Sequence, residues 1–151
     1  MMAKIEKVAI LVVAALGAIM LQMTEAEDFT VGDSTGWINN PPGGASFYSN
    51  WAKNFTFKVN DTLVFNFPTG RHVVAILSQA NFEKCNFTKP IQVLSTGPAR
   101  VALNRSGEFY FACAFTGHCN SGQKLSVNVV SASTSTSPSP APSPTASPPC
   151  Q

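Results

Sequence analysis

The chain has 151 residues, and its ten lysines and arginines against eight aspartates and glutamates give a net charge of +2 at pH 7. A small charge spread along a sequence argues against nucleic acid or an anionic membrane as a partner, because both are recognised by dense positive charge. The stretch 27–130 is long enough for one domain with its own hydrophobic core.

The first 26 residues are predicted to be a secretory signal peptide. Lys4 and Lys7 precede an apolar run over residues 8–21, and small residues follow at Thr24 and Ala26. This order of segments is typical of an export signal. The run has about 14 residues, whereas a membrane-spanning helix needs roughly 20. We therefore expect cleavage after Ala26, secretion to the extracellular space and cell wall, and no transmembrane anchor in the mature chain.

The stretch 27–130 is predicted to be all-β. Apolar and polar residues alternate in short runs between turn signals, and long helical periodicity is missing. This pattern is typical of a β-sandwich or barrel. The predicted strands cover residues 28–31, 55–59, 62–67, 73–77, 100–103, 108–112 and 124–130.

Two further groups of residues in this stretch receive a simple interpretation. Six aromatic side chains are interpreted as core filling, rather than as stacking residues for a sugar or as an electron path: Trp37, Phe47, Tyr48, Trp51, Phe65 and Phe67. Four N-glycosylation sequons mark expected surface positions in a secreted chain, at Asn54, Asn60, Asn86 and Asn104.

Residues 113–123, CAFTGHCNSGQ, carry the chemistry. They place the Cys113 thiol, the His118 imidazole and the Gln123 amide at steps of five. His72 is the other of the two histidines in the chain. Two imidazoles and a thiolate with a weak oxygen donor are the ligands of a blue-copper electron-transfer site, so these four residues are the candidate metal ligands.

Strand parity predicts which way two of these groups point, since side chains two apart share a face of a strand. Cys113 follows Phe109 and Phe111 on one face, and Gln123 shares a face with the aliphatic residues 125, 127 and 129. The thiol and the amide should therefore point inward at one end of the sandwich, with glycines in the connecting loop letting it double back. Parity leaves His72 undecided, because both faces of its strand are apolar.

Four cysteines allow three complete pairings, and not all of them need be bonded. With Cys113 required as a thiolate, Cys85 and Cys119 are the obvious pair, and the bond would act as a structural staple worth roughly 3–4 kcal/mol. Cys150 is either an intermolecular link or a free thiol. It lies in residues 131–151, a Pro/Ser/Thr-rich segment expected to be disordered, to carry O-linked sugars and to reach cell-wall polymers.

Residues 27–130 resemble the phytocyanins, the secreted cupredoxins of plants, and among them most nearly the stellacyanins. The resemblance is carried by DFTVGDSTGW, FYSNW, TLVFNF, the spacing of His72 and Cys85, and YFACAFTGHCNSGQKLSVNVV. It implies a cupredoxin-like Greek-key β-sandwich of about seven to eight strands with one disulfide, Cys85–Cys119. It also implies one copper ion, cycling between Cu(I) and Cu(II), on His72, Cys113, His118 and Gln123. Val73 departs from the pattern, because relatives often have a polar residue after the first histidine that can hydrogen-bond across to the cysteine loop.

The function expected from these observations is that of a secreted one-electron carrier rather than an enzyme, exchanging electrons with small redox molecules or a redox protein. Three alternatives are open. The first is a cell-wall glycoprotein in which copper is structural or incidental. The second is a zinc site of Cys113, Cys119, His118 and His72. The third is an enzyme with Cys113 as nucleophile, for which the sequence supplies neither an orienting acid nor an oxyanion hole.

Overall fold

A computed structural model describes residues 25–131 of the chain. The predicted signal peptide, apart from its last two residues, lies outside the described residues. So do the tail after residue 131 and Cys150. No helix within residues 25–131 is both long enough and apolar enough to cross a membrane.

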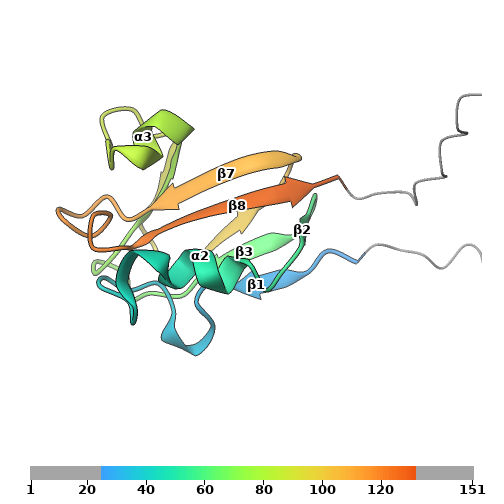
Figure 1. Cartoon of the computed structure of the whole chain (residues 1–151), viewed down its shortest axis with the longest axis horizontal. Helices are drawn as coiled ribbons and strands as arrows, with labels where there is room; N and C mark the ends of the chain where they lie inside the picture. Colours follow the sequence, from blue (N-terminus) through green and yellow to red (C-terminus); the bar gives the residue numbers. More distant parts are fainter. Residues whose placement is uncertain (1–24, 132–151) are drawn as a thin grey trace, which may run out of the picture.

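The domain is a sandwich of two β-sheets (Figure 1), which confirms the predicted fold class. One sheet has the strand order β1-β3-β6, and the other has the order β2-β8-β7-β4-β5. The pairs β1–β3 and β2–β8 are parallel, and the other neighbours are antiparallel. The strands are β1 (Asp28–Thr30), β2 (Phe57–Lys58), β3 (Thr62–Phe65), β4 (Val74–Leu77), β5 (Gln92–Leu94), β6 (Ala99–Ala102), β7 (Gly107–Ala112) and β8 (Lys124–Val130).

The short helical elements were not predicted from the sequence. Helix α2 (Phe47–Ala52) forms because Tyr48 and Trp51, three residues apart, share its buried face, but six residues are too few to show a period. Helix α3 (Gln79–Glu83) begins after Ser78, whose hydroxyl accepts from the Asn81 amide. Two 3-10 turns, η1 (Asp33–Thr35) and η2 (Gly44–Ser46), were also not predicted.

The strand predictions were wrong at two places. Strand β5 was not predicted, because it is an edge strand with two exposed residues and one partly buried residue, and so has no alternating pattern. The strand predicted over residues 55–59 is only the two-residue strand β2, because a turn begins at residue 59 and only Phe57 and Lys58 pair with β8.

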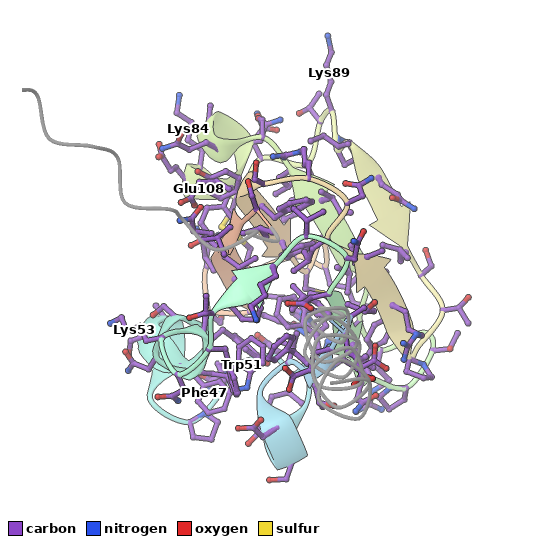
Figure 2. The ribbon with its side chains drawn as sticks, turned by 90° about the vertical axis from the view of Figure 1, so that its right-hand side faces the viewer. Phe47, Trp51, Lys53, Lys84, Lys89 and Glu108 are labelled. Carbon is purple, nitrogen blue, oxygen red and sulfur yellow. A yellow bond between two sulfur atoms is a disulfide. The ribbon has the colours of Figure 1, made fainter. Side chains whose placement is uncertain are left out.

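Alternation along β7 and β8 builds the core. Phe109 and Phe111 of β7 are buried, and Leu125, Val127 and Val129 of β8 are buried opposite them. The aromatic residues do fill the core: Trp37, Tyr48, Trp51, Phe65 and Phe67 are buried, and Phe47 packs against them. Figure 2 shows Trp51 on the inner side of α2, whereas Lys53 of the same segment points outward.

Two contacts fix the outer parts of the domain. A disulfide joins Cys85 to Cys119, as predicted, with a sequence separation of 34 residues. Near the start of the domain the buried carboxylate of Asp61 accepts hydrogen bonds from the backbone nitrogen atoms of Glu27, at 3.0 Å, and Lys58, at 2.7 Å. The second contact ties the first described residues to the turn before β3.

The two ends of the sandwich differ in what they carry (Figure 1). The chain enters β1 and leaves β8 at one end, whereas the orange loop between β7 and β8 lies at the other. That loop contains residues 113–123, so three of the four predicted metal ligands lie far from the points where the described chain begins and ends.

Candidate metal centre

Backbone hydrogen bonds hold the loop of residues 113–123 in a fixed shape. The Cys113 amide donates to the Gln123 carbonyl at 3.0 Å, which extends the antiparallel pairing of β7 and β8 by one step. The backbone N–H of Gln123 in turn donates to the backbone carbonyl of His118 at 3.0 Å. The three predicted ligands of this loop are therefore held together through the main chain, before any contact between their side chains.

Glycine at position 122 is required by close packing as well as by conformation. Gly122 has a φ of +100°, and a Cβ atom there would lie 2.8 Å from backbone atoms of Gly44 and Ala45. Only glycine accepts both conditions without strain. The residue before Gln123 is thus packed directly against turn η2, and Gly117, with a φ of +80°, makes the other reversal of the loop.

His72 comes from a different part of the chain, the connection between β3 and β4. Its Nδ1 lies 3.4 Å from Nδ1 of His118, and Nδ1 of His118 lies 3.4 Å from Sγ of Cys113. The three ligating atoms all lie within 4.8 Å of one another. Cys113 is buried and both histidines are partly exposed. The structure thus brings together two imidazoles and a thiol that are up to 46 residues apart.

Gln123 has the burial expected of a fourth donor. Its side chain is fully buried, and neither its amide oxygen nor its amide nitrogen has a hydrogen-bond partner within the described residues. Burying such a group without a partner costs about 1–3 kcal/mol, and native proteins rarely leave one unexplained. The unpartnered amide, next to three converging metal donors, fits a site that is completed by an ion.

Burial shifts the pKa values of two of the predicted ligands toward their neutral forms. Burial raises the pKa of the Cys113 thiol, against the effect of backbone hydrogen bonds from Val73 and Phe115. Burial lowers the pKa of His72, with further lowering by His118 and Arg71. The Gln123 amide opposes this shift, although neither of its polar atoms makes a hydrogen bond of good geometry. Both shifts favour the neutral form of the group, so a bound ion would have to displace the thiol proton, whereas the lowered pKa of His72 leaves its imidazole lone pair more available.

The donor set discriminates among metals. Imidazole and thiolate suit copper and zinc, and exclude calcium and magnesium, which require oxygen ligands. The four-residue zinc site considered from the sequence is wrong, because Cys119 is bonded to Cys85 and has no thiolate to offer. Within residues 25–131, Cys113 is the free cysteine.

Comparison with known proteins identifies the family. The sequence model of the plastocyanin-like domain family matches residues 37–123. The chain belongs to the phytocyanins, the plastocyanin-like blue copper proteins of plants. It is 47% identical over 107 residues to a blue copper protein of Arabidopsis thaliana, covering 71% of this chain and 54% of that one. It thus spans about half of that relative.

Two further relatives are stellacyanins. The chain is 39% identical over 105 residues to the stellacyanin of Toxicodendron vernicifluum, covering 70% of this chain and 98% of that protein. The copper-bound structure of cucumber stellacyanin covers 73% of this chain and 100% of its own, with 41% identity and a TM-score of 0.66. Copper is therefore the cofactor of this phytocyanin domain.

A contact of Lys124, next to the candidate ligand Gln123, was not predicted from the sequence. Nζ of Lys124 donates to the Phe82 carbonyl at 2.7 Å and lies 4.1 Å from the centre of the Phe82 ring. Burial lowers the pKa of Lys124, and the charge of Glu83 opposes this shift. The contact ties the residue after Gln123 to α3. No sequence signal marks it, because 42 residues separate the two partners.

Proposed function

We propose that the domain is a one-electron carrier in which His72, Cys113 and His118 bind copper, with the amide oxygen of Gln123 as a weak fourth ligand. The observation that carries the proposal is the convergence of three donor atoms within 4.8 Å beside a buried amide that has no other partner. Membership of the phytocyanins, and the stellacyanins among the relatives, support copper as the ion.

When bound, copper supplies a couple between Cu(I) and Cu(II) that accepts and releases a single electron. The protein contributes binding, orientation and exclusion of water. The Cys113 thiolate and the two imidazoles compromise between the soft donors that Cu(I) prefers and the nitrogen and oxygen donors that Cu(II) prefers. Hydrogen bonds between the backbones of Cys113, His118 and Gln123 keep the donors of this loop from rearranging, which limits the reorganisation on electron transfer.

The exposure of the ligands indicates where electrons would enter and leave. Cys113 and Gln123 are buried, whereas the two imidazoles are partly exposed. Beside His118 the ring of Phe115 is 37% exposed, with its centre 5.6 Å from the imidazole centre. A small redox molecule or a redox protein would therefore approach the histidine edges at this end of the domain.

The surroundings of Cys113 support a ligand rather than a nucleophile. Reactive cysteines have a lowered pKa and are at least partly accessible, whereas Cys113 is fully buried and burial raises its pKa. This supports the proposal that the protein is a carrier and not an enzyme.

We also infer that the protein is secreted with a cleaved signal peptide over residues 1–26, and that it carries sugars. A disulfide is typical of an oxidising compartment. Asn54, Asn60, Asn86 and Asn104 are all exposed, as N-glycosylation requires. These sequons and the Pro/Ser/Thr-rich tail over residues 131–151 also favour the second candidate, a cell-wall glycoprotein whose tail contacts wall polymers and in which copper has no redox role.

One experiment separates the two candidates. The mature chain is purified, loaded with Cu(II) and examined by optical and paramagnetic resonance spectroscopy, and its electron exchange with a small redox agent is followed by stopped flow. A carrier gives an intense thiolate-to-copper band, one copper per domain and fast, reversible exchange. Absence of stoichiometric copper, or bound copper that does not exchange electrons, overturns the carrier and leaves the wall glycoprotein.

A further inference from the structure

The connection between β3 and β4, which carries His72, is held at both of its ends by one residue, Trp37. The backbone nitrogen of Trp37 donates to the carbonyl of Asn66, the residue after β3, at 2.9 Å. Its indole Nε1 donates to the carbonyl of Val73, the residue before β4, at 3.0 Å. The segment 67–72 therefore starts and ends at peptide groups bonded to the same residue.

The two hydrogen bonds of Trp37 connect segments that strand pairing does not connect. Strand β3 belongs to the three-stranded sheet and β4 to the five-stranded sheet, so no ladder of hydrogen bonds joins them. The distance across their connection is thus not fixed by strand pairing. Trp37 joins the end of β3 to the start of β4 through these hydrogen bonds, close to the position where His72 meets Cys113 and His118.

Trp37 is itself held firmly. It is fully buried, and its ring packs 4.8 Å from the ring of Tyr48 and 5.0 Å from that of Phe65. The Tyr48 hydroxyl donates to the Gly36 carbonyl at 2.9 Å and accepts from the Ile38 amide at 2.8 Å, so both neighbours of Trp37 are fixed by one side chain.

Glycine before Trp37 allows the close approach to the β3–β4 connection. Gly36 has a φ of +71°, and a Cβ atom there would lie 2.9 Å from the carbonyl oxygen of Asn66. The backbone beside Trp37 therefore lies directly against the first anchored peptide. Val73 has no polar side chain, so the residue after His72 is held through its backbone: the carbonyl accepts from the Trp37 indole, and the backbone also contacts the Cys113 thiol.

We propose that Trp37 is a positioning residue for the copper centre: its indole hydrogen bond to Val73 sets the place of the His72 imidazole relative to Cys113 and His118. This inference rests on the proposed function, because it assumes that His72 binds copper. Residues that orient metal ligands from outside typically change metal affinity by roughly 10–100-fold when they are altered.

The test compares two tryptophans that differ in what their indoles bind. Trp37→Phe keeps an aromatic ring and removes the donor to Val73. Trp51→Phe is the matched control, since Trp51 is also buried but its indole donates to Asp33, at 3.0 Å. Thermal unfolding of the copper-free proteins measures the general loss of packing. Competition for Cu(II), the paramagnetic resonance spectrum and the reduction potential report on the centre.

We expect Trp37→Phe to weaken copper binding at least roughly tenfold and to change both the resonance spectrum and the potential. Trp51→Phe should leave all three unchanged while losing similar stability. The inference is overturned if Trp37→Phe keeps the native spectrum and affinity, or if both variants change them equally. If the unaltered chain takes up no copper, the proposed function itself fails; if it is blue and only the Trp37 result is negative, the inference alone fails.

A second variant separates the hydrogen bond from the volume of the side chain. Benzothienylalanine at position 37 has nearly the shape of tryptophan but a sulfur atom in place of the indole N–H. It should reproduce the spectral change of Trp37→Phe with less loss of stability, and it serves alone if Trp37→Phe does not fold. A native spectrum with this residue overturns the role of the indole hydrogen bond.

Discussion

Sγ of Cys113 lies 3.4 Å from Nδ1 of His118, within a loop whose two ends are joined by a backbone hydrogen bond. The thiol is fully buried and the imidazole is partly exposed. The thiol could therefore bind a metal ion while shielded from solvent. The imidazole would link that ion to the protein surface.

Replacing the thiol should remove the colour of the copper protein. Cys113→Ser eliminates the soft sulfur donor, and the intense visible band should vanish because it arises from thiolate-to-copper charge transfer. Absorption spectroscopy of the Cu(II)-loaded variant measures this. Cys150→Ser, which changes the other cysteine outside the disulfide, should stay blue; a blue Cys113→Ser protein would mean that a different sulfur binds the metal.

Exchanging the amide donor for a thioether should raise the reduction potential. The Gln123 oxygen is a harder donor than methionine sulfur and favours Cu(II), so Gln123→Met should shift the potential upward by more than about 60 mV, a tenfold change for one electron. Protein-film voltammetry measures the shift. Gln92→Met, at an exposed position of β5, should leave the potential unchanged. An unchanged potential in Gln123→Met would remove Gln123 from the copper site.

Adding one methyl group at Gly122 should destabilise the domain and disturb the centre. Gly122→Ala combines a φ of +100° with contacts at 2.8 Å to η2, and we expect a loss of about 3 kcal/mol in the free energy of unfolding. Gly43→Ala is the control, since Gly43 has a φ of +84° but nothing within 4 Å of its added Cβ. It should cost about 1 kcal/mol. Equal costs in urea unfolding would show that the contact with η2 is unimportant.

Tyr48 should make stability depend on pH in the alkaline range. Burial raises the pKa of Tyr48 to about 12, against a hydrogen bond with Ile38. The unfolded chain loses this proton first, near pH 10, so the free energy of unfolding should fall by up to about 1.4 kcal/mol per pH unit between pH 10 and 12.

Urea unfolding at a series of pH values measures that slope in the native protein and in two variants. Tyr48→Phe should be less stable at neutral pH by about 1–3 kcal/mol, because its hydrogen-bond partners are left unsatisfied, but flatter above pH 10. Tyr110→Phe changes the other, partly exposed tyrosine and should keep most of the slope. An undiminished slope in Tyr48→Phe would assign the alkaline loss to other groups.

Cleavage after Ala26 should strengthen the contact between Glu27 and Asp61. The backbone nitrogen of Glu27 lies 3.0 Å from the buried Asp61 carboxylate, and cleavage would turn that amide into a charged amino group. Hydrogen bonds to charged groups contribute about 1.5–3 kcal/mol, more than neutral ones. A chain starting at Glu27 should therefore be more stable than the same chain acetylated at Glu27.

A second variant checks this origin. Asp61→Asn, which removes the carboxylate charge, should abolish the advantage. Equal stability of the free and acetylated chains, or a mature protein sequenced to another first residue, contradicts the prediction.

Much of the fold followed from two-residue periodicity, because β7 and β8 bury alternate residues on one face. The short elements did not. Helix α2 has too few residues for a period, and β5 is a three-residue edge strand of which only Leu94 is partly buried. Elements of this kind are decided by tertiary packing rather than by the local pattern.

The grouping of the candidate ligands His72, Cys113 and His118 was predictable for a different reason. Cys113, His118 and Gln123 stand in one loop, and a second histidine was available only at position 72. The orientation of the His72 side chain was not predictable, because the residues that follow it are apolar on both faces of the strand. The hydrogen bond that anchors the peptide after His72 comes from Trp37, 36 residues away, and a buried tryptophan gives no sign of where its N–H points.

The separation of the loop between β7 and β8 from the ends of the described domain has a consequence for tethering (Figure 1). A polymer, matrix or neighbouring protein attached at either end of the described domain would hold it opposite the loop between β7 and β8 and leave the histidine edges exposed. An immobilised molecule of this kind could still receive electrons from diffusing reagents, much as an electrode modified through a remote linker keeps its active face free.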